Sequence, residues 1–89
     1  MGRIVLSVKM FPEDPATDLN VLKEAIKGKL PSYASVYRFD EEPIAYGLVA
    51  IIAHVVFPED KQGACNEVEE VLGKVSGVSQ TEVMMVRRA

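Results

Sequence analysis

The chain opens on an alternation of apolar and polar positions. Between residues 3 and 11 the apolar side chains Ile4, Leu6, Val8 and Met10 share one parity. Such alternation predicts a strand with one buried face. Pro12 and Pro15 follow and end it, because proline cannot donate a hydrogen bond to a strand ladder.

A helical pattern follows the prolines. Apolar residues recur three and four positions apart at Leu19, Leu22 and Ile26. Thr17 and Asp18 precede them and offer side-chain oxygens that can cap a first helical turn. Gly28 and Pro31 are typical stop signals, so the helix is predicted to end near Lys27.

The rest of the chain predicts three more strands and one more helix. Aromatic and β-branched residues favour a strand over residues 32–40, and the run Asp40-Glu41-Glu42-Pro43 is typical of a tight acidic turn. Residues 44–57 are apolar at both parities, which indicates a central strand covered at least partly on both faces. Helical spacing returns over residues 61–74, and a last strand is predicted over residues 78–86.

The order βαββαβ predicts the α+β fold called the ferredoxin-like sandwich. In this fold a four-stranded antiparallel sheet carries both helices on one face. The first and third strands are central, and the terminal strand is an edge strand beside the first. A length of 89 residues is that of one domain, so we expect a single domain over residues 1–89.

Composition narrows the class of function. The net charge is −3 at pH 7, and no basic stripe interleaved with aromatic residues is present. We therefore expect no direct binding to nucleic acid or to an anionic membrane. A single cysteine and an N-terminus that leads directly into strand-like alternation predict a cytoplasmic protein.

The residues that usually carry enzyme chemistry are sparse. No Gly-rich phosphate loop, CxxC pair or HExxH motif occurs, so we expect no catalytic residues, metal or cofactor. His54 lies in an apolar stretch and is interpreted as a packed strand residue, and Cys65 as a small core filler. A Cys-His dyad would lack a third, orienting group. The pairs Glu41-Glu42 and Glu59-Asp60 are interpreted as solvated turn residues.

Two further features each allow two interpretations. Tyr46 beside Gly47 is either a core aromatic or an exposed contact anchor, because the glycine leaves the ring uncovered on one side. The pair Arg87-Arg88 ends the last apolar run. It either solubilises a frayed end or forms a basic tip that reaches an acidic or phosphate-bearing site on a partner.

Three stretches together resemble one known family, the exchange-factor domain of translation elongation factor 1-beta, and most closely its archaeal form. DEEPIAYGLVAI (residues 40–51) resembles the family's acidic-Pro-Ile-(Ala/Gly)-aromatic-Gly motif. GVSQTEVMMVRRA (residues 77–89) resembles its terminal strand, which ends in a basic residue. VLSVKMFPEDPATDLNVLKEAIK (residues 5–27) resembles its first strand and helix.

The resemblance implies a guanine-nucleotide exchange factor that binds elongation factor 1-alpha, GDP-bound or nucleotide-free, as a monomer and without a cofactor. In the family, the terminal strand enters the partner's nucleotide site, and a basic residue displaces the magnesium ion. Arg88 falls on that position, and its neighbour Arg87 could share the role. Tyr46 falls on an aromatic that packs against the partner's second domain, and the motif around it supplies Pro43, Ile44 and Gly47.

A different class of protein fits the pattern without the resemblance. A small ferredoxin-like domain can be a regulatory ligand-binding module that acts as a homo-oligomer. The edge strand predicted over residues 78–86, with Met84 and Met85, would then pair with a second copy of the chain.

Overall fold

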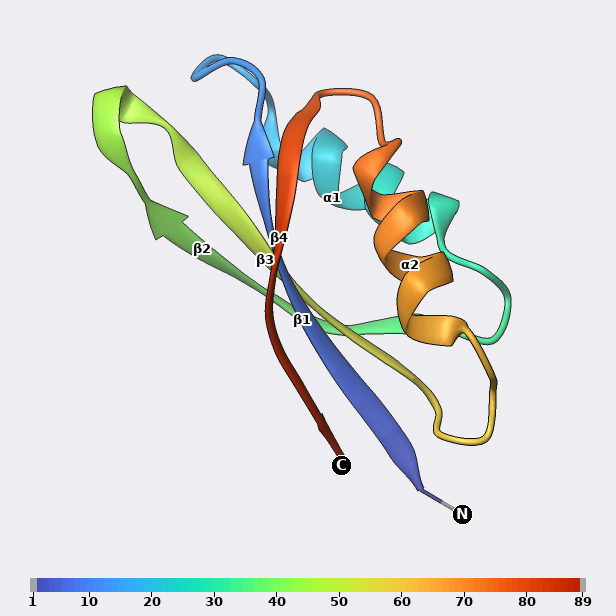
Figure 1. Cartoon of the computed structure of the whole chain (residues 1–89). Helices are drawn as coiled ribbons and strands as arrows, with labels where there is room; N and C mark the ends of the chain where they lie inside the picture. The colour runs from blue at the N-terminus through green and yellow to red at the C-terminus, as the bar shows by residue number, and fades with distance from the viewer. Residues whose placement is uncertain (1, 89) are drawn as a thin grey trace.

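The computed structural model describes residues 2–88, which form one four-stranded antiparallel sheet and two helices (Figure 1). The elements are β1 (Arg3–Pro12), α1 (Leu19–Lys29), β2 (Ser35–Pro43), the short 3-10 helix η1 (Ala45–Gly47), β3 (Val49–Pro58), α2 (Ala64–Gly73) and β4 (Val78–Arg88). The strand order β2-β3-β1-β4 confirms the ferredoxin-like prediction, with β1 and β3 central.

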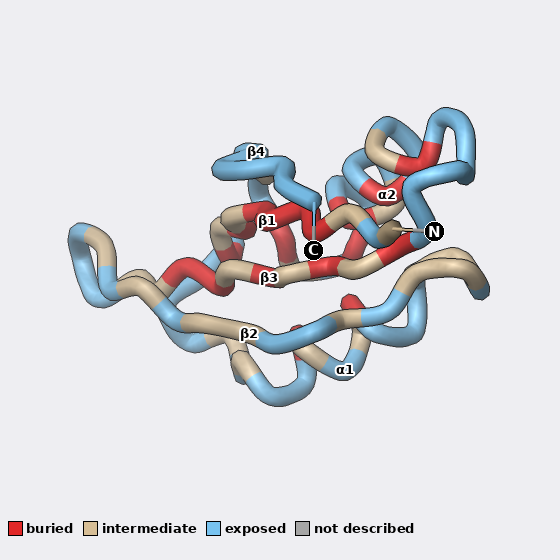
Figure 2. The backbone as a smooth tube through the Cα atoms, turned by 90° about the horizontal axis from the view of Figure 1, so that it is seen from below, coloured by how far each residue is buried: buried red, intermediate tan, exposed pale blue. Residues whose placement is uncertain are grey.

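The core lies between the sheet and the two helices. One parity of β1 and of β3 meets the apolar faces of α1 and α2, and the largest fully buried side chains include Leu6, Met10, Ile26, Ile51 and Leu72. Figure 2 shows that burial is concentrated in β1 and β3, whereas β4 is exposed along most of its length. The opposite face of the sheet carries no helix within residues 2–88.

Helix α1 begins as predicted and ends later than predicted. The Asp18 carboxylate accepts hydrogen bonds from the backbone N–H groups of Asn20 at 2.9 Å and Val21 at 3.3 Å, which confirms the cap. The helix continues through Gly28 to Lys29 and stops at Leu30, which is extended because Pro31 follows it. Neither helix of the described chain is long and apolar enough to cross a membrane.

The acidic turn predicted at Asp40-Glu41-Glu42-Pro43 is wrong. These residues are the last four of β2, which begins at Ser35, and β3 begins only at Val49. The carboxylates pair with cations on three elements: Asp40 with Arg38, Glu41 with Lys23 and Glu42 with Lys9. Pro43 is tolerated because it is the last residue of an edge strand.

The ends of α2 and β4 also differ from the prediction. Helix α2 starts at Ala64 instead of residue 61, directly after Gly63, whose φ of 73° lies in the left-handed region. Strand β4 extends to Arg88, because β1 begins early enough to pair with it. The two arginines therefore belong to the sheet and do not project beyond it as a separate tip.

Candidate functional site

Tyr46 lies at the apex of the β2–β3 connection and is 93% exposed, so the core interpretation of this residue is wrong. Its φ of 61° and ψ of 34° place it in the left-handed region. A bulky residue is a rare outlier there, and such strain concentrates at functional sites. An exposed aromatic ring in a strained turn is therefore a candidate contact residue.

The turn around Tyr46 is closed by the backbone. Ile44 N–H donates to the carbonyl of Leu48 at 2.8 Å, and Leu48 N–H donates to the carbonyl of Ala45 at 3.2 Å. Gly47 has a φ of 76°, which explains why glycine is favoured there. Nothing lies within 4 Å of the position that a Cβ on Gly47 would take, so within this chain the glycine serves the turn and not a close backbone approach.

Arg87 and Arg88 point to opposite faces of the sheet. Arg87 is opposite Val5 and Arg88 is opposite Ile4, and directly paired residues share a face. Ile4 packs against the core cluster, so Arg88 lies on the helix-covered side. Arg87 lies on the uncovered side. Two adjacent arginines therefore have different surroundings and are not interchangeable.

Arg88 is engaged by Glu59, the first residue after β3. Its Nε and Nη2 donate to Oε2 of Glu59 at 2.9 Å and 2.6 Å. The backbone N–H of Gly2 donates to the other carboxylate oxygen at 3.2 Å. Glu59 is an exposed turn residue, as predicted, but its side chain also joins the ends of β1, β3 and β4.

The structure does not bring Tyr46 and the arginines together. Arg88 is level with Phe57 near the end of β3, because both are paired with Ile4. Val49, the first residue of β3, is about 27 Å from Phe57 if each residue of an antiparallel strand adds about 3.4 Å. Tyr46 lies beyond Val49, in the turn that precedes β3. Figure 1 shows the β2–β3 turn and the end of β4 at opposite ends of the long axis, whose extent is 42 Å.

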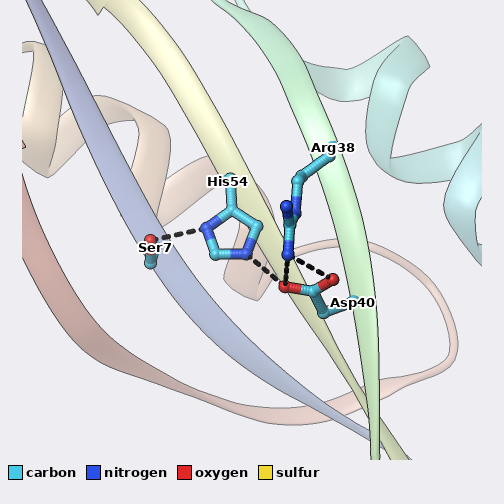
Figure 3. A network of polar contacts seen from close by, with 4 residues as sticks. All are labelled: Ser7, Arg38, Asp40 and His54. Carbon is cyan, nitrogen blue, oxygen red and sulfur yellow. Dashed lines mark hydrogen bonds and ion pairs between the residues drawn. The ribbon is translucent and has the colours of Figure 1, made fainter. Parts of the chain in front are cut away.

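A polar network crosses the uncovered face between these two ends (Figure 3). Ser7 and His54 are opposite each other on β1 and β3, and the Ser7 hydroxyl lies 2.7 Å from Nδ1 of His54. Nε2 of His54 donates to Oδ2 of Asp40 at 2.8 Å. Arg38 Nη2 donates to both oxygens of the same carboxylate at 3.0 Å. The network ties β1, β3 and β2 together by side chains.

The order of contacts resembles a hydrolytic triad only superficially. Ser7 is 5% exposed within β1, where neighbouring backbone N–H groups belong to the sheet ladders and are not free to stabilise an oxyanion. The network is better explained as the means by which polar side chains on a sheet face satisfy one another.

A shallow hollow of about 290 Å³ adjoins this network. It is lined by Ser7, Asp40, Ile52, His54, Met84, Met85 and Arg87. The β1–β4 register shifts between Ser7 and Val8, so β4 carries one extra residue there. The methionines are 49% and 54% exposed. The hollow gives the uncovered face apolar contact area beside the guanidinium of Arg87.

Sequence reasoning missed the network, although a signal was present. Ser7 and His54 are polar residues in the two strands that the sequence predicts to be central. Because those strands are neighbours, the two side chains could have been expected to lie opposite each other on one face of the sheet. Cys65 packs against the core on the helix-covered side, so it cannot form a dyad with His54. Among residues 2–88 no group of three or more His, Cys, Asp or Glu side chains is arranged to hold a metal ion.

The network predicts how the ionisation of Asp40 responds to the loss of its partners. The hydrogen bond from His54 is the largest cause that lowers the pKa of Asp40 below 3.8, and the hydrogen bond from Arg38 is the second. A lowered pKa contributes stability above pH 3.8 that is lost as the pH falls through the folded-state value. Replacing either His54 or Arg38 with alanine should therefore raise the pKa of Asp40 toward its ordinary value.

The measurement is a carboxyl-carbon NMR titration of Asp40 in the wild type and both variants between pH 2 and 6. Thermal unfolding over the same range should show a weaker acid dependence in Asp40→Asn than in the wild type. An unchanged pKa of Asp40 in both variants would contradict the assignment.

The fold is that of a ferredoxin-like domain, and exposed candidate contact residues lie at both ends of its sheet. Residues 5–89 match the family described as EF-1 guanine nucleotide exchange domain. The chain is 40% identical to Elongation factor 1-beta of Hyperthermus butylicus, over 99% of this chain and 96% of that protein. It is 43% identical to Elongation factor 1-beta of Methanothermobacter thermautotrophicus, over 99% and 98% of the two chains.

A third relative, Elongation factor 1-beta of Sulfurisphaera tokodaii, is 41% identical over 99% of this chain and 97% of its own. Together with the match over residues 5–89, these similarities show that the chain belongs to the EF-1 guanine nucleotide exchange domain family. The resemblance drawn from the three sequence stretches is confirmed at the level of the family.

Proposed function

We propose that this protein is a guanine-nucleotide exchange factor that promotes GDP release from elongation factor 1-alpha. The observation that carries the proposal is the family match, which spans residues 5–89 and so includes both ends of the sheet. In this proposal the whole chain acts as one exchange domain, as a monomer in the cytoplasm, without a cofactor and without forming a covalent bond.

The distance between the two ends of the sheet supports the proposal that the binding partner is a large protein. Tyr46 and Arg88 lie about 27 Å or more apart along β3, at the rise of an antiparallel strand. A small ligand cannot contact both, whereas two domains of one protein can. We assign Tyr46, with Pro43, Ile44 and Gly47 shaping its turn, to docking at one end.

We assign Arg88 to the partner's nucleotide site at the other end. GDP is held largely through Mg²⁺ and phosphate contacts, so a cation that approaches the metal repels it and weakens nucleotide binding. By linkage, a factor that binds the empty partner better than the loaded one lowers nucleotide affinity by the same ratio. Arg87, on the uncovered face beside the exposed Met85, adds contact with the partner.

The test is release of a fluorescent GDP analogue from the cognate elongation factor 1-alpha during a chase with excess unlabelled GDP. At substoichiometric amounts, the wild-type protein should accelerate release over many turnovers. The double variant Tyr46→Asn/Arg88→Ala is the matched control and should leave release near its spontaneous rate. No acceleration by folded wild-type protein with an active partner would refute the proposed function.

A further inference from the structure

Glu59 is held in a defined position between the first and last strands. Its backbone N–H donates to the carbonyl of Gly2 at 3.1 Å, and the N–H of Gly2 donates to Oε1 of Glu59 at 3.2 Å. A Cβ on Gly2 would lie 2.9 Å from this carboxyl group. The residue at position 2 therefore leaves room for the carboxylate, whose Oε2 is directed to Arg88.

The Glu59 carboxylate binds the guanidinium of Arg88, which is the cation that the proposed exchange step needs. The Arg88 side chain is 77% exposed, yet two of its nitrogens bind one oxygen of Glu59. Arg87 has no ion pair within residues 2–88, and Asp40, which lines the same hollow, is paired with Arg38 and His54. Glu59 thus selects Arg88, and not Arg87, for neutralisation in the free protein.

We propose that Glu59 is a latch that holds Arg88 in the free protein and must release it before the guanidinium acts on the partner's metal site. This inference rests on the proposed exchange function and adds a step of regulation to it. While the pair is closed, the carboxylate offsets the field of the guanidinium at the metal. Exchange by repulsion therefore requires the open state.

The latch is weak enough to open. Exposed ion pairs of this kind are typically so weak that about 15–40% of the Arg88 population would be unpaired at any time. A reaction that uses only the unpaired fraction is slowed in proportion to that fraction. Removing the Glu59 carboxylate leaves every Arg88 side chain unpaired. The rate of GDP release should therefore rise by about two- to sixfold.

The decisive variant is Glu59→Gln, which removes the charge and keeps the size of the side chain. The release rate at saturating amounts of this variant should exceed that of the wild type by about two- to sixfold. Glu70→Gln is the matched control, because it changes the net charge equally and breaks an exposed ion pair between Glu70 of α2 and Lys74, the residue after that helix. It should leave the release rate unchanged.

The Arg88→Ala background separates release of the latch from a general change of charge at this end of the sheet. In Arg88→Ala protein, the additional change Glu59→Gln should give no gain, because no guanidinium remains to be released. The Nε–H resonance of Arg88 in free protein should move in Glu59→Gln and not in Glu70→Gln. A gain that persists without Arg88 would overturn the latch.

The outcomes also separate the latch from the function on which it rests. Exchange by the wild type with an equal or slower rate in Glu59→Gln would overturn the latch and leave the exchange function standing. No exchange by the wild type or by any variant would overturn the function, and the latch with it. A rise in the GDP release rate that occurs only in proteins that retain Arg88 supports both the latch and the exchange function.

Discussion

Replacing Arg88 with alanine is expected to slow GDP release from elongation factor 1-alpha by about ten- to a thousandfold at saturating factor. At an effective dielectric of about 20, unit charges about 4 Å apart repel by about 4 kcal/mol, which sets the upper limit of about a thousandfold. The dissociation constant of the complex should change much less, because the guanidinium acts on the metal and not on the docking surface. Stopped-flow release and a separate binding titration measure the two quantities.

Two variants serve as controls for Arg88→Ala. Arg88→Lys keeps the charge and should retain most of the release rate, although an ammonium lacks the planar fork of a guanidinium. Arg87→Ala removes the neighbouring charge from the other face of the sheet. It should raise the half-saturating concentration and leave the maximal rate nearly unchanged. Equal losses of rate and affinity in Arg88→Ala would contradict insertion at the metal site.

Replacing Tyr46 with asparagine is expected to weaken binding to the partner by about thirtyfold or more, the loss typical of an aromatic hot spot. Asparagine tolerates the left-handed conformation, so the turn and the free energy of unfolding should be preserved or improved. The maximal release rate at saturating factor should stay within a few fold of the wild type. Isothermal calorimetry and chemical unfolding measure affinity and stability on the same samples.

Tyr37 offers a matched control for Tyr46. It is 65% exposed on β2, so Tyr37→Ala also removes an exposed aromatic ring. That variant should bind the partner like the wild type, because Tyr37 lies within the strand and not in the strained turn. Unchanged affinity for the partner in Tyr46→Asn, or an equal loss of affinity in both variants, would contradict a specific docking role for Tyr46.

The fold was predictable because the burial periodicity of this chain agrees with its topology. The alternation in β1 and the helical spacing of Leu19, Leu22 and Ile26 each match one buried face, which is the signal that sequence patterns report best. The turn was misplaced because Asp40-Glu41-Glu42-Pro43 has the composition of a loop. Its charges are instead paired across strands and to α1, which no local pattern reveals.

The candidate site was predictable in its residues but not in its arrangement. Motif resemblance singled out Tyr46, Arg87 and Arg88, yet it carries no information about their separation or about the face on which each lies. Those facts depend on register. The pairing of Arg88 with Glu59 depends on two elements meeting at one end of the sheet, and sequence distance gives no indication of that contact.

The most direct test of the central claim, that both ends of one sheet act on one partner molecule, is a mixing experiment. Tyr46→Asn and Arg88→Ala proteins are added together to elongation factor 1-alpha loaded with a fluorescent GDP analogue, each at a concentration far below saturation by Tyr46→Asn, and the release rate is measured. If each molecule needs both ends, the mixture stays slow and falls below Tyr46→Asn alone, because Arg88→Ala protein occupies the partner. Restoration of release toward the wild-type rate would show that the two ends act independently and would contradict the account.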